Sequence, residues 1–314
     1  IIRTAARPLI KNLDELPFPA YHLVKIEKYS PPPGLFFKKP IIGMITSRGC
    51  PYDCNFCADT IIWQGQCRMK KSQFVVDEME YLVTKFGAKE IKFYDDTFTA
   101  NRSRVVEICQ EILKRKIDVL WRCGSRVDRV DLELLRLMKE SGCCSITFGI
   151  ESGSDEILEK MNKNITVKQI KNAVKAAKSA GIETKGYFIL NYPGETIATT
   201  EQTIKLSGEL NLDFAVFNLF LPYPGTKARK EVESSYQIEP KLWDKIDVSY
   251  GDQIYFYQDK LPAKYLKSAY RRAGLGFYLR PRYILKSLLR INNLEMLKSY
   301  LLGFLRLFKI GIKA

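Results

Sequence analysis

Histidine is almost absent from this sequence. The single histidine, His22, lies in the N-terminal segment, and the rest of the 314 residues contain none. A catalytic triad that uses histidine as its base is therefore nearly excluded in the body of the chain, and so is a zinc site with several histidine ligands. The chemistry of the chain must rest on other side chains.

Long apolar runs and a secretory signal are also missing. No uninterrupted apolar stretch reaches the roughly 18 residues that a membrane-spanning helix needs. The first residues lack both the layout of a secretory signal and an initiator methionine, so we expect the sequence to be part of a longer chain. Eight cysteines, three of them crowded, fit a reducing compartment better than a disulfide framework, which predicts a cytoplasmic protein.

Positive charge is concentrated at one end of the chain. The segment from Lys260 to Ala314 has 13 lysines and arginines and one acid, Glu295, so it carries +12 of the net charge of +15. The first 259 residues are close to neutral. A nucleic-acid-binding surface spread over the whole protein is therefore not expected.

A regular alternation of strand and helix patterns runs from residue 41 to about residue 220. We expect strands over 41–46, 90–94, 119–123, 145–150, 187–190 and 214–220. Helices are expected over 72–86, 101–115, 131–141, 154–161, 166–180 and 196–210. The helix ends carry local signals, such as Gly87 after the first helix and a capping box formed by Thr166 and Gln169. Six β–α repeats build either an open doubly wound sheet or a barrel.

Polar residues decide between these two architectures. They follow five successive predicted strands, at 50–57, 95–96, 126, 151–152 and 191–195. A barrel gathers the ends of all its strands at one rim, whereas an open sheet concentrates its site at one switch point. We therefore predict an α/β fold, a partial (β/α)6 TIM-like barrel with a C-terminal helical extension.

Three regions are expected along the chain. Residues 1–40 are rich in proline and predict a linker that wraps onto the next region, residues 41–225 form the barrel, and residues 226–314 form the extension. From Ile284 to Phe308, apolar residues recur at helical spacing between lysines and arginines. Such basic amphipathic helices can lie on a membrane surface or pack on the barrel. Packing is favoured, and peripheral membrane contact stays open.

Three cysteines stand close together directly after the first predicted strand. Cys50, Cys54 and Cys57 are spaced Cys-x-x-x-Cys-x-x-Cys, and Phe56 precedes the last of them. Three thiolates without an obvious fourth ligand favour an iron–sulfur cluster with one open iron. The alternatives are an iron–sulfur electron carrier, a zinc-stabilised binding protein, or three structural thiols. Cys67 is held open as a second-site candidate.

This motif resembles the signature of the radical S-adenosylmethionine (SAM) superfamily. The resemblance implies an enzyme with a 4Fe-4S cluster on Cys50, Cys54 and Cys57, and with SAM bound to the open iron. It further implies reductive cleavage of SAM to a 5′-deoxyadenosyl radical that takes hydrogen from a substrate. A flavodoxin- or ferredoxin-type protein would supply the electron.

The resemblance also suggests residues that hold SAM. Asp95 and Asp96 end a predicted strand and would place an acid near the SAM amino group. The alternative is that they cap a helix and are solvated in a loop. Glu151 is placed to bind the ribose hydroxyls. Arg126 or Lys163 would pair with the SAM carboxylate, and the sequence does not choose between them. The remaining candidates for cofactor contact are Phe56, Ser152, Tyr192 and Gly194.

A narrower resemblance concerns radical SAM enzymes associated with a cobalamin-binding domain. Asp-Asp-x-Phe-Thr, Gly-Ile-Glu-Ser-Gly-Ser, Pro-Gly-Glu-Thr and Tyr-Pro-Gly-Thr are similar to that group, which includes anaerobic Mg-protoporphyrin cyclases and hopanoid-modifying enzymes. Its members usually carry the cobalamin domain ahead of a linker like residues 7–19, and here the sequence begins at the linker. Asn191 stands where that group often has glycine. Cobalamin and methyl transfer are therefore open.

The substrate is less defined than the cofactors. A small-molecule or lipid-like substrate, such as a lipid or tetrapyrrole, fits the amphipathic tail. Modification of RNA, as by methylthiotransferase relatives, is the enzyme alternative. The charged segment has an apolar face and the RNA-binding appendage of those relatives is not apparent, so nucleic acid is not expected.

Overall fold

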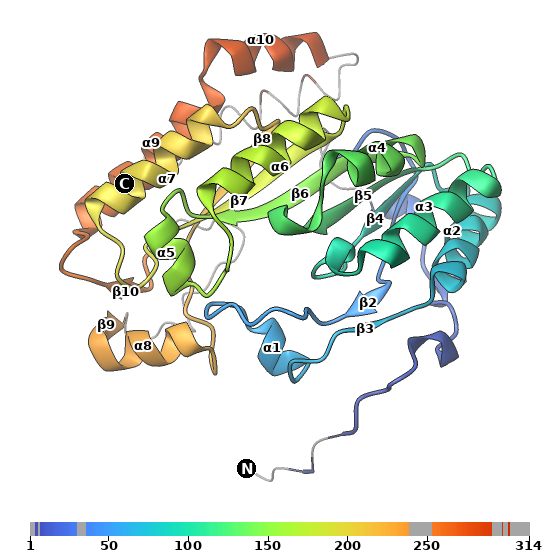
Figure 1. Cartoon of the computed structure of the whole chain (residues 1–314), viewed down its shortest axis with the longest axis horizontal. Coiled ribbons are helices and arrows are strands. Elements are labelled where there is room, and N and C mark those ends of the chain that lie inside the picture. Colours follow the sequence, from blue (N-terminus) through green and yellow to red (C-terminus); the bar gives the residue numbers. More distant parts are fainter. Residues whose placement is uncertain are drawn as a thin grey trace.

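A parallel six-stranded sheet forms the centre of the protein (Figure 1). The computed structural model describes residues 4–5, 7–29, 36–238, 253–290, 297 and 301. The strands are β1 (Ile41–Met44), β4 (Glu90–Phe93), β5 (Leu120–Ser125), β6 (Cys143–Glu151), β7 (Glu183–Leu190) and β8 (Phe214–Leu219).

The order of these strands confirms the predicted partial barrel. They lie side by side in chain order, β1-β4-β5-β6-β7-β8, without the reversal that creates a switch point in a doubly wound sheet. In the described residues β1 and β8 each have one neighbour in this sheet and do not pair with each other, so the barrel is open.

Helices cover the outer face of the sheet (Figure 1). These helices are α2 (Ser72–Phe86), α3 (Arg102–Lys114), α4 (Leu132–Glu140), α6 (Val167–Ser179), α7 (Ile197–Glu209) and α9 (Ala263–Tyr278). The other described helices are α1 (Asp59–Ile62), α5 (Asp155–Lys160), α8 (Lys227–Ser235) and α10 (Pro281–Arg290). The predicted end signals are confirmed. Gly87 ends α2 with φ 62°, and Thr166 and Gln169 form a capping box on α6.

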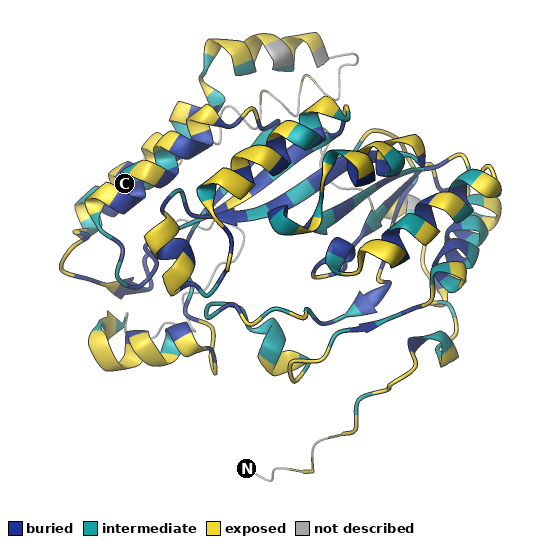
Figure 2. Ribbon diagram, viewed as in Figure 1, coloured by how far each residue is buried: buried dark blue, intermediate teal, exposed yellow. Residues whose placement is uncertain are grey.

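The core lies between the sheet and these helices. Side chains alternate between the two faces of each strand, so Phe93, Phe148 and Phe188 point to the helices and are almost fully buried. Their neighbours Tyr94 and Tyr187 point to the opposite, inner face and remain exposed. Figure 2 shows the same contrast between buried strands and exposed outer helix faces. Each fully buried aromatic or aliphatic side chain stabilises the fold by about 1.5–3 kcal/mol.

A short two-stranded ribbon lies beside the sheet. Its strands β2 (Ser47–Arg48) and β3 (Arg68–Met69) pair antiparallel, and α1 lies between them in sequence. The N-terminal segment contributes three single turns, η1 (Leu13–Glu15), η2 (Tyr21–Leu23) and η3 (Ile26–Lys28). It contacts α2, because the rings of Phe18 and Phe74 lie 5.0 Å apart and the Tyr21 hydroxyl donates to Glu78 (2.8 Å).

The C-terminal extension covers the open edge at β8. It includes β9 (Gln237–Ile238), which pairs with β10 (Phe256–Tyr257), and then α9. The Tyr278 hydroxyl accepts from the Ala215 amide (3.3 Å) and donates to the Ala215 carbonyl (2.6 Å). One side chain thereby satisfies backbone groups that an exposed edge strand would offer to another chain.

The predicted tail helix is described only in part. Helix α10 extends to Arg290, while residues 291–296, 298–300 and 302–314 of the predicted helix lie outside the described residues. Leu285, Leu288 and Leu289 on α10 are exposed. Among the helices that the structure describes, none has the length and apolar character required to cross a membrane.

Candidate functional site

The cysteine loop, residues 49–58, follows β2 and leads into α1. It begins at Gly49, whose φ is +91° and whose backbone passes the Gln66 carbonyl so closely that a Cβ would lie 2.0 Å from that oxygen. Only glycine fits both conditions. The loop is therefore held tightly against the segment that returns to β3.

The paired carboxylates after β4 have different environments. Asp95 is buried, and both of its oxygens accept hydrogen bonds, from the Thr46 amide (2.6 Å), the Ser47 amide (3.0 Å) and the Thr46 hydroxyl. Burial raises the pKa of Asp95, although the bonds from Thr46 act in the opposite direction. Asp96 is exposed and accepts from the Gly49 amide (3.1 Å). Asp95 therefore anchors the entry to the cysteine loop, and Asp96 faces solvent.

The three thiols differ in burial. Cys54 is buried, whereas Cys50 and Cys57 are half-buried. A turn joins two of them, because the Cys57 amide donates to the Cys54 carbonyl (3.1 Å), and the Cys50 sulfur lies 3.4 Å from the Thr97 hydroxyl. Burial raises the pKa of Cys54, and it raises the pKa of Cys57 to about 11.

The described side chains near the three thiols are not arranged to bind a single metal ion. Within the described ranges, no three His, Cys, Asp or Glu side chains form a group that could hold one metal ion. A 4Fe-4S cluster does not require such convergence, since each thiolate binds a different iron.

Two cations lie next to Cys54. The Arg126 Nη1 is 3.8 Å from the Cys54 sulfur, and its Nη2 donates to the Lys163 carbonyl (2.6 Å). The Lys163 ammonium donates to Glu151 Oε1 (2.8 Å). Burial lowers the pKa of Lys163, but Glu151 and Cys54 outweigh burial, so the pKa is raised. Cations beside a thiol favour the thiolate, which is the form that binds metals.

Aromatic side chains of the cysteine loop lie against the same cations. The Arg126 guanidinium is 3.9 Å from the centre of the Tyr52 ring, and the Lys163 ammonium is 5.7 Å from that of Phe56. Such contacts stabilise a cation by about 0.5–2 kcal/mol. They fix the loop to Arg126, directly after β5, and to Lys163, between α5 and α6.

The neighbouring ends of β6 and β7 carry unusual backbone conformations. Glu151 and Asn191 both have a backbone φ of 65°, which residues other than glycine rarely adopt. The register between β6 and β7 shifts at Gly149, where a Cβ would lie 2.4 Å from Glu151 Oε1 and 2.9 Å from Lys163 Nζ. Gly149 therefore leaves the space that the Glu151–Lys163 ion pair occupies. Backbone of this kind concentrates at functional sites.

Two of the side chains predicted to contact the cofactor form hydrogen bonds within the protein. Ser152 is fully buried, its hydroxyl lies 3.2 Å from that of Thr203 on α7, and it accepts from the Ser154 amide (3.1 Å). Tyr192 is also fully buried, and its hydroxyl donates to the Lys160 carbonyl (3.3 Å). Ser152 thus connects the end of β6 to α7, and Tyr192 connects the end of β7 to α5.

Gln258 is a residue of this region that the sequence did not reveal. Its amide group donates to Asn191 Oδ1 (2.8 Å) and to the Tyr192 carbonyl (3.1 Å), while its oxygen accepts from the Gly194 amide (3.1 Å). A lone glutamine far along the chain from this turn carries no motif. Its role becomes visible only from the folded contacts.

The structure brings most of the predicted residues into one connected region. Arg126 contacts Cys54 and Lys163. Lys163 in turn contacts Glu151 and Phe56. Asp96 and Cys50 lie on the β4 side of the loop, since Asp96 binds Gly49 and Cys50 contacts Thr97. The turn that contains Gly194 is at the end of β7.

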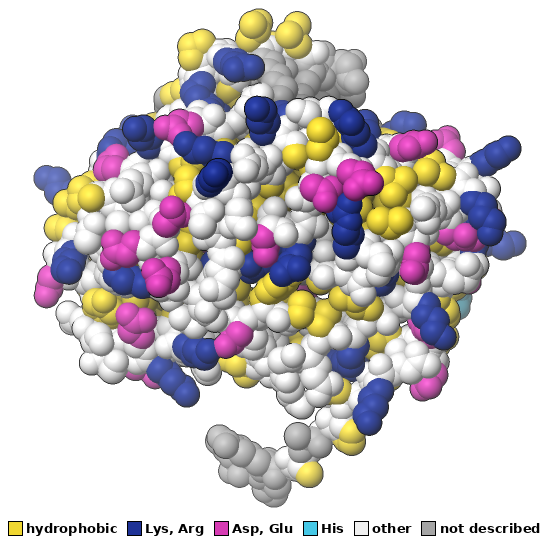
Figure 3. Space-filling view, viewed as in Figure 1, with side chains coloured by type: hydrophobic (Ala, Val, Ile, Leu, Met, Phe, Trp, Pro, Cys, Tyr) yellow, Lys and Arg dark blue, Asp and Glu magenta, His cyan; other side chains and the backbone are white. Residues whose placement is uncertain are grey.

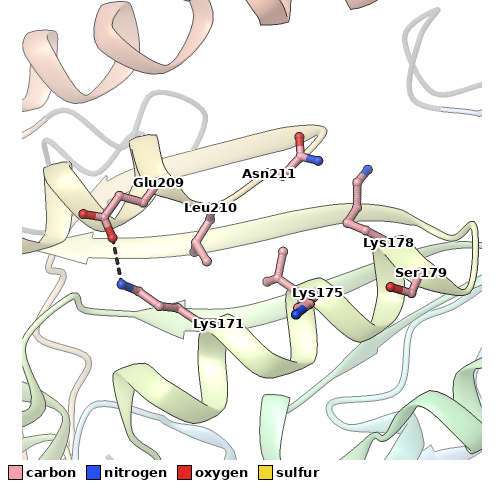
Figure 4. Close-up of a pocket in the computed structure, with 8 residues that line it drawn as sticks. Lys171, Lys175, Lys178, Ser179, Glu209, Leu210 and Asn211 are labelled. Carbon is pink, nitrogen blue, oxygen red and sulfur yellow. Dashed lines mark hydrogen bonds and ion pairs between the residues drawn. The ribbon is translucent and has the colours of Figure 1, made fainter.

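A separate pocket of about 550 Å³ lies between α6 and the end of α7 (Figure 4). It is lined by Lys171, Val174, Lys175, Lys178, Ser179, Glu209, Leu210 and Asn211. None of the predicted site residues lines it. Lys171 pairs with Glu209 (2.8 Å) and Lys178 with Asp213. Figure 3 shows positive and negative side chains interspersed over one face of the molecule.

Comparison with known proteins identifies relatives of this chain. The radical SAM superfamily profile matches residues 44–207. An uncharacterized methyltransferase of Pyrococcus horikoshii is 35% identical over 303 residues, which are 96% of this chain and 64% of the relative. The anaerobic magnesium-protoporphyrin IX monomethyl ester cyclase of Rubrivivax gelatinosus is 30% identical over 76% of this chain and 42% of its own. The chain thus spans about half the length of these relatives.

Solved structures share the fold. The cobalamin-dependent SAM radical enzyme OxsB with aqua-cobalamin bound superposes with a TM-score of 0.62, at 17% identity, over 85% of this chain and 46% of that one. The radical SAM methyltransferase TsrM of Kitasatospora setae gives a TM-score of 0.57 at 22% identity, over 62% of this chain and 37% of that one. At these identities the likeness concerns the fold alone.

Proposed function

Because the chain belongs to the radical SAM superfamily of enzymes, we propose that Cys50, Cys54 and Cys57 hold a 4Fe-4S cluster whose open iron binds SAM. When bound, the cluster supplies the electron that cleaves the sulfonium of SAM. The observation that carries the proposal is the pair of cations at Cys54, with Arg126 Nη1 3.8 Å from the sulfur and Lys163 held beside it by Glu151. A cluster with three thiolates is negatively charged, so a buried thiol flanked by cations fits it.

The rim residues divide the binding of SAM among them. Asp96, exposed beside the loop entry, is suited to the cationic amino group. Arg126 is suited to the carboxylate, since it lies closest to Cys54, and Glu151 keeps its second oxygen for the ribose hydroxyls. The turn at Gly194 would lie along the adenine. Asp95, Ser152 and Tyr192 would act by holding these residues in place.

Cluster binding is tested with Cys54→Ala. The full chain, reconstituted anaerobically with iron and sulfide, should hold about four irons per chain and form 5′-deoxyadenosine from SAM and dithionite. Cys54→Ala should lose the cluster and reduce 5′-deoxyadenosine to background, whereas Cys109→Ala, a buried thiol in α3, should keep both. A folded Cys54→Ala variant that retains cluster and cleavage would overturn the assignment.

The narrower function we propose is cobalamin-dependent methyl transfer. It is supported by the relatives named as methyltransferases and by the shared fold of the cobalamin-binding OxsB and TsrM. Residues 41–225 would form the catalytic core, and residues 226–314 would shape the substrate side. A flavodoxin- or ferredoxin-type protein would supply electrons, in the cytoplasm. Contact of the tail with a membrane surface would rest on the exposed leucines of α10.

Equilibrium dialysis of the full chain against hydroxocobalamin tests this narrower proposal. Because the sequence begins at the linker that follows the cobalamin domain in that group, we expect weak retention, which becomes tighter in the presence of SAM, as coupled binding requires. Hydroxocobalamin dialysed without the chain, and hydroxocobalamin dialysed with serum albumin, serve as controls. If no cobalamin is retained with or without SAM, cobalamin dependence of this chain is wrong, while the cluster assignment is unaffected.

A further inference from the structure

The inner face of the sheet, opposite the helices, is defined by the alternation of side chains. Lys92 and Tyr94 lie on it at the end of β4, because Ile91 and Phe93 point into the core. On β7 the same rule places Lys185 and Tyr187 on the inner face, since Phe188 points into the core. This face ends at the rim that carries the cysteine loop.

Small residues occupy the middle of the inner face. The register pairs Gly124 of β5 with Thr147 of β6, and Thr147 with Lys185 of β7. A Cβ on Gly124 would have no neighbour nearer than the Asp95 carbonyl at 3.8 Å, so the space above it is open. On either side, Tyr94 and Tyr187 are 56% and 39% exposed. Two aromatic rings therefore flank a floor of small side chains.

Two lysines on this face have no carboxylate partner among the described residues. Lys92 lies 4.1 Å from the centre of the Tyr94 ring, and Lys185 lies 5.1 Å from that of Tyr187. Two nearby cations are paired with carboxylates, Arg122 with Glu90 and Lys163 with Glu151. A half-buried ammonium over an aromatic ring is a ready partner for an anion.

We propose that the substrate is a flat, apolar molecule that carries acidic groups, and that Lys92 and Lys185 bind those groups while Tyr94 and Tyr187 enclose its apolar body. This inference rests on the proposed radical SAM function, since it assigns the inner face below the cysteine loop to the substrate. The two lysines are on different strands and at different heights along the strand direction. Lys92 is level with Arg122, and Lys185 is level with Gly124 two residues further along β5. A molecule with two acidic groups at different depths fits this arrangement.

Fluorescence titration of the full chain with 1-pyrenebutyrate and with its methyl ester tests the proposal. Both probes have the same flat apolar body, but only the first has a carboxylate. The wild type should bind the acid more tightly than the ester, and raised ionic strength should reduce this preference. The double variant Lys92→Gln, Lys185→Gln should weaken binding of the acid about tenfold and leave the ester within about twofold.

Two further variants make the result specific. Lys171→Gln, which removes a lysine on the outer helix α6, should change neither affinity. Tyr187→Leu should weaken both probes, because it removes an aromatic wall without removing charge. Equal affinity of the acid and the ester, or an equal loss with Lys171→Gln, would overturn the proposal.

Iron content and 5′-deoxyadenosine formation separate this inference from the proposed function. In the double lysine variant both should match the wild type, since neither lysine touches the cysteine loop in the described contacts. If the cluster forms and SAM is cleaved but charge does not affect binding of the probe, the substrate inference alone is wrong. If the probe binds as expected but no cluster forms, the cluster assignment alone is wrong.

Discussion

Glu195 is fully buried in the turn after β7. Burial raises its pKa from 4.5 to about 8, although bonds from the Asn191 and Tyr192 amides act against the rise. Its pKa is thus higher in the folded chain than in the unfolded chain. Between about pH 4.5 and pH 8 the folded state holds a proton that the unfolded state has lost. The contribution of Glu195 to stability is therefore present at low pH and is lost as the pH rises through this window.

Replacing Glu195 by glutamine should remove this pH dependence. Between about pH 5 and pH 8 the decrease in the free energy of unfolding should be smaller in Glu195→Gln than in the wild type, by an amount on the order of 3 kcal/mol. Denaturant titrations at several pH values would measure it. Glu159→Gln, at an exposed position on α5, serves as the control and should keep the wild-type slope. Parallel profiles for Glu195→Gln and the wild type would contradict the prediction.

At the scale of elements, the segment after β10 supports the rim from outside the barrel. Gln258 binds Asn191, Tyr192 and Gly194, so the turn after β7 depends on a residue of the C-terminal extension. The same extension covers the edge of β8 through Tyr278. The extension is therefore part of the site's framework.

Truncation of the Gln258 side chain should weaken that framework. Gln258→Ala leaves the buried Asn191 oxygen and the Gly194 amide without partners, which should cost about 1–3 kcal/mol of unfolding free energy. Gln237→Ala, an exposed glutamine in β9, should change stability by less than about 0.5 kcal/mol. Denaturant unfolding would compare the two. Equal stabilities would show that the three bonds of Gln258 are not needed.

For the molecule as a whole, local signals predicted the elements well and long-range contacts poorly. The bounds of α2 were predicted correctly, because a glycine with left-handed backbone marks its end. The start of β7 was predicted at residue 187, but the strand begins at Glu183, since pairing with β6 overrides the polar sequence Glu-Thr-Lys-Gly. The spacing of the three cysteines was sufficient to predict the family.

The site could be predicted only where a motif marks it. Strand ends pointed to Arg126 and Glu151, and the resemblance added Lys163. The sequence could not show that Asp95 turns inward while Asp96 faces solvent. That difference depends on the amides of Thr46, Ser47 and Gly49, which approach the end of β4 only in the folded chain. Gln258 was missed for the same reason.

The separation of Cys54 and Arg126 along the chain means that they are synthesised at different times. The two residues are 72 positions apart. At a synthesis rate of about 5–20 residues per second, the ribosome makes Arg126 roughly 4 to 14 s after Cys54. During those seconds the thiols exist without the side chains that later surround them, open to oxidants and to stray metals. Protecting the nascent chain in that interval falls to the cell.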